Sequence, residues 1–154
     1  MPLSPEVVPL GVSAALEDYL EAIAELGGTR GTVRSRDLAA RLRVHKSTVT
    51  AALHSLAEKG LVHYAPYVAV SLTVSGRAVA GQVCRRHQVL RRFLGGILGM
   101  DALGADETAC RLEHAVDPEC LERLLRLGAF LESSAEWRTW SGRAGDPPET
   151  PGAG

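Results

Sequence analysis

Apolar residues between positions 13 and 28 recur every three or four residues, as one buried face of a helix requires. Ser13 can cap the first turn and Gly27-Gly28 interrupts the pattern, so we predict a helix over residues 14–26. Asp18 and Glu21 are three positions apart, so their carboxylates project from the same side of this helix. Taken alone, such a pair is typical of a solvated helix face.

Two further apolar stripes follow, separated by a break at residues 43–45. The first predicts a short helix that begins at Ser35 or Arg36, and the second predicts a longer helix that ends at Lys59-Gly60. The face opposite the second stripe carries small, hydroxylic and basic side chains: Lys46, Ser47, Thr48, Thr50, Ala51 and His54. Such a face can enter the major groove of DNA, because hydroxyls and methyl groups can contact base edges. The two stripes therefore predict a helix-turn-helix whose second helix reads DNA.

Strand-forming residues at 61–64 and 67–72, around Ala65-Pro66, predict a short hairpin wing after the second helix. The alternative is a helical hairpin that packs inside some other kind of domain. Charge favours the DNA-binding interpretation, because residues 29–60 hold seven Arg or Lys against two acids in a chain of net charge -1. The expected DNA contacts are Arg36, Lys46, Ser47, Thr48 and Thr50, with Arg43 and Tyr67 as phosphate contacts.

A third major helix is predicted over about residues 75–98, with Gly95-Gly96 allowing it to bend or end. His87 lies on this helix among apolar and basic neighbours, which is typical of a structural histidine. Gly104-Ala105-Asp106 is then expected to cap a helix on which Cys110, Glu113 and His114 share one face. A thiol, a carboxylate and an imidazole can together hold a divalent first-row metal ion. The alternative is an ordinary amphipathic helix with a buried cysteine.

Asp117-Pro118 predicts the start of a last helix, because an aspartate cap followed by proline is a strong start signal. Its broad leucine-rich stripe predicts either core packing or a dimer face. We expect an irregular segment at 1–12, a DNA-binding domain at 13–73, a helical metal-binding and dimerisation domain at 74–134, and a disordered Pro/Gly-rich tail at 135–154.

Composition narrows the class of protein further. The 154 residues are 45% hydrophobic and 23% charged, which is ordinary for globular domains. No apolar run reaches the roughly 18 residues of a membrane span, and the N-terminus lacks the basic region of a signal peptide. Three cysteines at irregular spacing favour free thiols over a disulfide framework. We therefore expect a cytoplasmic protein with no membrane partner.

Several segments together resemble the iron- and manganese-dependent transcriptional repressors of the diphtheria-toxin-repressor and manganese-transport-regulator family, over roughly residues 13–132. They are LEDYLEAI, DLAARLRVHKSTVTAALHSLAEKGLV, SLTVSGRAVA, RRHQVLRRFL and ACRLEH with the leucine-rich helix after it. The resemblance implies a mainly α fold, with an N-terminal winged helix-turn-helix domain, a C-terminal helical dimerisation domain and divalent metal bound between them. We expect a two-domain form without the third, SH3-like domain of longer members.

Carried over residue by residue, the resemblance implies six metal ligands: Asp18, Glu21, His87, Cys110, Glu113 and His114. Asp18 and Glu21 resemble the manganese branch of the family, whereas Cys110 resembles the iron branch. Mn(II) is the favoured metal, Fe(II) is the alternative, and Zn(II), Co(II) or Cd(II) are expected to substitute in vitro. Arg91 and Asp106 stand where the iron branch has a glutamate and a histidine of a second site, so such a site is expected to be broken or rebuilt.

The function that follows is a homodimeric regulator that represses metal-uptake genes by binding a palindromic operator in double-stranded DNA when metal is present. It is not expected to be an enzyme. One alternative is a winged-helix transcription factor that needs no metal. Another is a small metallohydrolase with Glu113 as base, although no recognisable oxyanion hole or substrate loop supports it.

Overall fold

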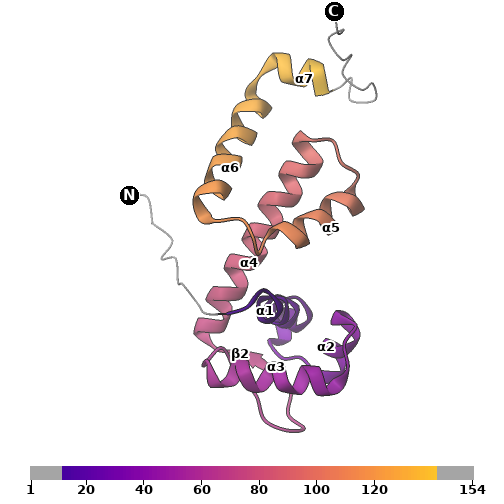
Figure 1. Cartoon of the computed structure of the whole chain (residues 1–154), viewed down its shortest axis with the longest axis vertical. Coiled ribbons are helices and arrows are strands. Elements are labelled where there is room, and N and C mark those ends of the chain that lie inside the picture. The colour runs from indigo at the N-terminus through magenta and orange to yellow at the C-terminus, as the bar shows by residue number, and fades with distance from the viewer. Residues whose placement is uncertain (1–11, 142–154) are drawn as a thin grey trace, which may run out of the picture. The chain divides into compact units, whose positions relative to one another are not determined.

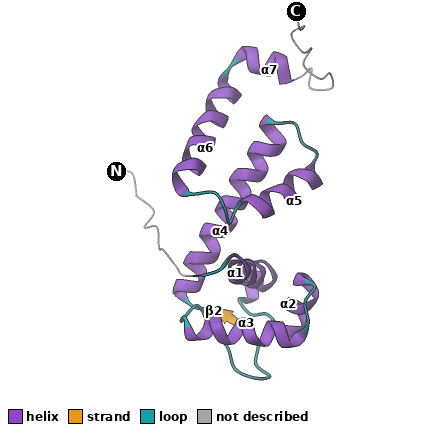
Figure 2. Cartoon of the chain, in the orientation of Figure 1, coloured by secondary structure: helices purple, strands orange, loops and turns teal. Residues whose placement is uncertain are grey.

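The computed structural model describes residues 12–141 and is mainly helical, as expected (Figure 2). The chain divides into two compact units, Met1–Arg85 and Arg86–Gly154. The division falls inside helix α4 (Val74–Arg92), whereas the sequence pattern places the boundary just before this helix. The reason is packing, because Val79 and Ala80 of α4 belong to the hydrophobic core of the first unit.

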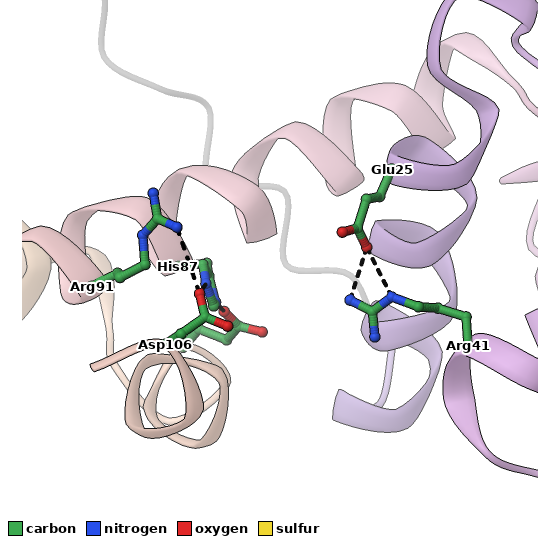
Figure 3. A network of polar contacts seen from close by, with 6 residues as sticks. Glu25, Arg41, His87, Arg91 and Asp106 are labelled. Carbon is green, nitrogen blue, oxygen red and sulfur yellow. Dashed lines mark hydrogen bonds and ion pairs between the residues drawn. The ribbon is translucent and has the colours of Figure 1, made fainter. Parts of the chain in front are cut away.

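The first unit begins with α1 (Ala14–Gly27), whose N-cap Ser13 accepts a hydrogen bond from the backbone of Leu16 as predicted. A short 3₁₀ turn, η1 (Gly28–Arg30), leads to α2 (Ser35–Leu42). Glu25 of α1 accepts two hydrogen bonds from the guanidinium of Arg41 in α2, the shorter at 2.8 Å (Figure 3). This ion pair links the outer surfaces of two helices whose inner faces share one core.

The helix-turn-helix is formed by α2 and α3 (Lys46–Glu58), which Figure 1 shows in the lower part of the view. Arg43 adopts a left-handed conformation with φ of 55° at the end of α2, and this reverses the chain between the helices. α3 buries Val49, Leu53 and Leu56 and leaves Lys46 to Thr48 exposed. The predicted division of α3 into a core face and a polar face is confirmed.

The wing is shorter than predicted. Its strands are only β1 (Val62–His63) and β2 (Ser71–Leu72), which pair antiparallel with Val62 opposite Leu72. Val33 and Val70 exchange two backbone hydrogen bonds of 2.8 and 2.7 Å, so the segment before α2 extends the pairing. Residues 65–69 form a loop because Pro66 has no N–H for a ladder and Tyr67 adopts a left-handed φ of 65°.

The second unit contains the end of α4, the π-helical turn η2 (Phe93–Ile97), α5 (Ala102–Leu112), α6 (Pro118–Ser133) and α7 (Ala135–Ser141). The pattern predicts one helix over 75–98, but α4 ends at Arg92. From there the backbone hydrogen bonds span five residues in place of four, as in a π-helix; the Leu98 N–H, for example, donates to the Phe93 carbonyl at 3.1 Å. Gly95 and Gly96 both lie in this turn. The expected bend is therefore a change of helix type.

Two other expectations for this unit were wrong. Asp101 caps α5 by accepting a hydrogen bond from Gly104 at 2.9 Å, so residues 104–106 lie within the helix and do not begin it. The expected disordered tail at 135–154 instead starts with helix α7, supported by a hydrogen bond of 3.2 Å from the Trp137 backbone to the Ser134 hydroxyl. Expectations for residues 1–11 and 142–154 lie outside the described residues.

A small hydrophobic core holds the second unit together. Leu90 and Leu94 pack against Ala105 and Ala109 of α5 and against Leu121 of α6. Asp117 caps α6 at 2.7 Å from the Cys120 backbone, with Pro118 next to it, as predicted. None of the helices in the described range 12–141 is both long and apolar enough to cross a membrane.

The start of α4 carries a glycine that the fold requires. The Thr73 hydroxyl donates to the Gly60 carbonyl at 2.7 Å and accepts from the Gly76 backbone at 3.0 Å. These two hydrogen bonds hold the start of α4 against Gly60, which follows α3. A Cβ on Gly76 would overlap the Leu61 backbone carbonyl. No side chain fits here without moving the backbone.

We predict that Gly76→Ala lowers the free energy of unfolding by about 1–3 kcal/mol, because overpacking forces the helix away from Leu61. Gly81→Ala on the same helix is the matched control: its Cβ would meet open space, and it should stabilise the protein by up to about 1 kcal/mol. Urea denaturation followed by circular dichroism measures both values. Equal stability of the two variants would contradict the packing described here.

Candidate metal centre and nucleic-acid interface

A buried carboxylate lies at the end of α5. The helix stops at Leu112, whereas the sequence pattern carries it through His114, so Glu113 forms its C-cap and His114 lies in the following turn. Glu113 keeps helical backbone angles and donates its backbone N–H to Ala109 at 2.9 Å. Its side chain is 0% exposed. Among residues 12–141, which the structure describes, Glu113 is the one charged residue that is fully buried. A buried carboxylate is costly unless a cation or hydrogen-bond donors compensate for its charge.

Two imidazoles of the same unit approach this carboxylate, one at each oxygen. His87 Nδ1, from α4, lies 2.7 Å from Glu113 Oε2. His114 Nε2 lies 3.3 Å from Glu113 Oε1. Both histidine side chains are mostly buried, at 17% and 15% exposed. The second unit thus brings two of the six predicted metal ligands, His87 and His114, against a third, Glu113.

The chemistry of this donor set fits a divalent transition metal. Imidazole nitrogen and carboxylate oxygen together suit Mn, Fe and Zn. Adjacent ligands at a right angle around an ion with bonds of about 2.1 Å lie about 3.0 Å apart. The 2.7 Å and 3.3 Å separations bracket this value, so both His–Glu pairs have the spacing of neighbouring ligands.

The other ring nitrogen of His87 faces a second carboxylate. His87 Nε2 lies 3.0 Å from Asp106 Oδ1, and the same oxygen lies 3.6 Å from Arg91 Nη1. Figure 3 shows His87 and Arg91, both from α4, directed at Asp106 of α5. At these two positions, where the family resemblance led us to expect a broken or rebuilt second site, the structure has an ion pair.

The remaining predicted ligands are placed as follows. Cys110 lies on α5 and is exposed, in contrast to the buried Glu113 one turn later. Asp18 and Glu21 lie in the first unit, both half-buried, on α1. Tyr19, between them in sequence, turns instead to the core, and its burial raises the pKa of the phenol above its usual value. Asp18 and Glu21 are thus less buried than the core residue between them.

A separate groove lies in the first unit between α2, α3 and the wing. Its lining includes four of the seven predicted DNA contacts, namely Arg36, Lys46, Thr50 and Tyr67. Ser47, Thr48 and Arg43 are also exposed but do not line it. The groove further includes Arg34, Ser35, His54 and Tyr64. This lining of cations, hydroxyls and aromatic rings is the chemistry expected of a surface for nucleic acid.

His54 and Tyr64 are groove residues that our list of DNA contacts omits. Their rings meet edge to face with centroids 5.2 Å apart, which joins the recognition helix to the wing. His54 was recognisable from its place on the polar face of α3. Tyr64 was not, because its position beside the groove depends on the course of the hairpin.

Comparison with known families matches each part of the chain to a domain. The family model described as iron dependent repressor, N-terminal DNA binding domain, matches residues 12–70. The model described as iron dependent repressor, metal binding and dimerisation domain, matches residues 73–136. The chain belongs to the iron-dependent repressor family. The family resemblance found from the sequence is thereby confirmed, and so is the expected pair of DNA-binding and metal-binding, dimerising domains.

Individual relatives support the same assignment. An uncharacterized HTH-type transcriptional regulator of Methanocaldococcus jannaschii is 37% identical over 114 residues, which are 73% of this chain and 91% of the relative. Transcriptional regulator MntR of Escherichia coli O157:H7 is also 37% identical, over 70% of this chain and 68% of its own. The diphtheria toxin repressor of Corynebacterium efficiens is 36% identical over 72% of this chain and 48% of its own.

A solved manganese-dependent transcriptional repressor in complex with manganese has the same fold, with a TM-score of 0.68 and 35% identity. The match covers 75% of this chain and 53% of the solved chain, so this protein spans about half the length of that structure. Structures of the related protein ScaR contain zinc or cadmium and align with TM-scores of 0.62 at 28% and 29% identity.

We predict that Lys46→Ala weakens binding to DNA of any sequence, because a phosphate-neutralising cation is lost from the groove. The slope of log K against log salt should become shallower by about 1. Lys59→Ala, an exposed lysine just beyond the other end of α3, is the control and should leave the slope unchanged. Fluorescence anisotropy at several salt concentrations provides the slopes. Equal slopes for Lys46→Ala and the unmodified protein would show that this groove does not contact phosphate.

Proposed function

We propose that this protein is a manganese-responsive DNA-binding repressor of metal-uptake genes, active as a homodimer on a palindromic operator. The observation that carries the proposal is the buried Glu113 carboxylate, with one histidine nitrogen near each of its oxygens. In a chain whose second half matches a metal binding and dimerisation domain, this donor set is best explained as part of a metal site.

The proposed ligand set has six members: His87, Cys110, Glu113 and His114 from the second unit, with Asp18 and Glu21 from the first. In the second unit His87 and His114 each lie within 3.3 Å of a Glu113 carboxylate oxygen. Asp18, Glu21 and Cys110 are assigned by residue type, spacing and family resemblance. Three carboxylates and two imidazoles favour manganese, a metal for which oxygen ligands are suited, while Cys110 makes iron the alternative. Exposure of Cys110 is one more reason to rank manganese first.

A bound divalent ion supplies the positive charge that offsets repulsion among Asp18, Glu21 and Glu113. The packing of α1 then connects metal binding to DNA binding. Asp18 and Glu21 lie on α1, and α1 shares its hydrophobic core with α2 and α3 of the helix-turn-helix. Ordering of the two carboxylates therefore restrains the helices that read DNA, and in a dimer it restrains the spacing of two recognition helices.

This coupling is reciprocal. Whatever factor metal adds to the affinity for DNA, DNA adds to the affinity for metal, and such factors are typically about 5–150-fold. The groove residues Arg36, Lys46 and Thr50, with Ser47, Thr48, Arg43 and Tyr67 around them, supply the contacts to DNA in this proposal. The relatives named transcriptional regulator MntR and diphtheria toxin repressor, and the solved manganese-dependent transcriptional repressor, support a metal-dependent repressor.

We predict that Glu113→Gln abolishes the Mn(II) stimulation of DNA binding while leaving weak metal-free binding unchanged. The amide has nearly the same shape as the carboxylate but carries no charge to bind a cation. Glu107→Gln is the matched control, since Glu107 is an exposed residue of the same helix α5. Anisotropy of chelator-treated protein on a labelled promoter fragment, titrated with Mn(II), measures the stimulation.

The outcomes separate the candidate functions. Stimulation in the unmodified protein and Glu107→Gln, but not in Glu113→Gln, supports the metal-dependent repressor. Tight binding by all three proteins without any metal would instead support a winged-helix regulator that needs no metal. Titration with anaerobic Fe(II) in parallel ranks the two metals by the free concentration that each requires.

A further inference from the structure

We propose that Asp106, held in place by Arg91, is a positioning residue that fixes the orientation and the protonated nitrogen of His87 for metal binding. This inference rests on the proposed function, because it assumes that His87 is a metal ligand. It assigns roles to two residues outside the six proposed ligands. The geometry that supports it lies entirely within the second unit.

The two nitrogens of His87 are engaged differently. Nδ1 faces the buried Glu113 at 2.7 Å, whereas Nε2 faces the half-exposed Asp106 at 3.0 Å. A neutral imidazole can give only one nitrogen to a metal, and the other nitrogen carries the proton. Since Nδ1 is on the side of the ligand Glu113, Nε2 is left to donate its hydrogen to Asp106. A carboxylate that accepts from the outer nitrogen of a ligand histidine fixes the ring and raises its basicity.

Arg91 completes the arrangement from the same helix as His87. The two residues are four positions apart on α4, and Arg91 Nη1 lies 3.6 Å from the Asp106 oxygen that also faces His87 (Figure 3). The guanidinium and the imidazole thus face the same oxygen of Asp106. The positive charge of Arg91 offsets the negative charge that Asp106 places beside the His87 ring.

Exposure distinguishes positioning from stabilisation of the fold. The Arg91 and Asp106 side chains are 56% and 51% exposed. Ion pairs this open to solvent contribute little to the free energy of unfolding. Loss of the pair should accordingly leave the metal-free protein folded and change only the affinity with which His87 and the other ligands bind a metal.

The test compares Asp106→Ala, Asp106→Asn, Arg91→Met and Arg91→Lys in the full chain. Mn(II) affinity is measured without DNA, from the electron paramagnetic resonance signal of free Mn(II). Asp106→Ala should weaken the affinity about 10–100-fold, as loss of such a partner typically does. Asp106→Asn keeps an acceptor oxygen without the charge and should fall between Asp106→Ala and the unmodified protein. Arg91→Met should weaken binding and Arg91→Lys should recover part of the loss.

Arg92→Met is the matched control, because the neighbouring Arg92 is an exposed arginine of the same helix that pairs with Glu132 at 2.9 Å. It should bind Mn(II) like the unmodified protein. A second readout follows the imidazole nitrogens of His87 by ¹H–¹⁵N correlation in the Zn(II)-loaded protein. The unmodified protein should show a proton fixed on Nε2, and Asp106→Ala should lose this fixed signal, which a purely structural role would not cause.

Each outcome is decisive. Equal Mn(II) affinity in Asp106→Ala and the unmodified protein overturns the positioning role but leaves the proposed function intact. No Mn(II) binding by the unmodified protein overturns the proposed function itself. If Asp106→Ala loses its metal-free fold, Asp106→Asn takes its place, and an unchanged affinity there overturns the positioning role.

Discussion

A carboxylate enclosed at the end of a short helix is the constraint on which the second unit depends. Glu113 has no exposed surface, and its charge is tolerable only where cations or donors approach both oxygens. His87 and His114 do so from α4 and from the turn after α5. Leu90, Ala105 and Ala109 pack α4 against α5 and so hold the three side chains in register. The small hydrophobic core thus serves mainly to position a polar cluster.

The first unit instead presents cations and hydroxyls on a rigid surface. Leu38, Leu53 and Val70 are completely buried, so α2, α3 and the wing cannot shift independently of one another. The polar groove between them follows from that packing. α1 belongs to the same core and also bears Asp18 and Glu21. In our proposal this shared core is what lets a change at two carboxylates reach the DNA-reading surface.

Periodicity was enough to predict the helices, because each has a clear apolar stripe and most have capping residues such as Ser13 and Asp117. It failed where local geometry depends on neighbours. Asp106 looked like a cap, yet Asp101 was the better placed aspartate. The wing strands were too long in our prediction, since Tyr67 adopts a conformation that residue type alone does not favour. Cys110 and Glu113 are three positions apart at the end of α5, yet Cys110 is exposed and Glu113 is buried, a difference that residue spacing does not reveal.

The candidate site was predictable in its membership more than in its arrangement. His87 taken alone looked structural, and only the family resemblance joined it to Glu113 and His114; the structure places both histidines against Glu113. The role of Asp106 was not predictable, because a contact between residues 19 positions apart depends on how α4 packs on α5. The metal was not predictable from residue type, because Asp18 and Glu21 favour manganese whereas Cys110 favours iron.

The most direct test of the account is hydrogen–deuterium exchange of α1 in the absence of DNA, with and without Mn(II). If Asp18 and Glu21 are ligands, Mn(II) should slow amide exchange in the peptide spanning Ala14–Gly27 together with the peptides around His87 and Glu113. Protection confined to the peptides around His87 and Glu113, with exchange in α1 unchanged at saturating Mn(II), would contradict the claim that metal binding restrains the DNA-binding unit.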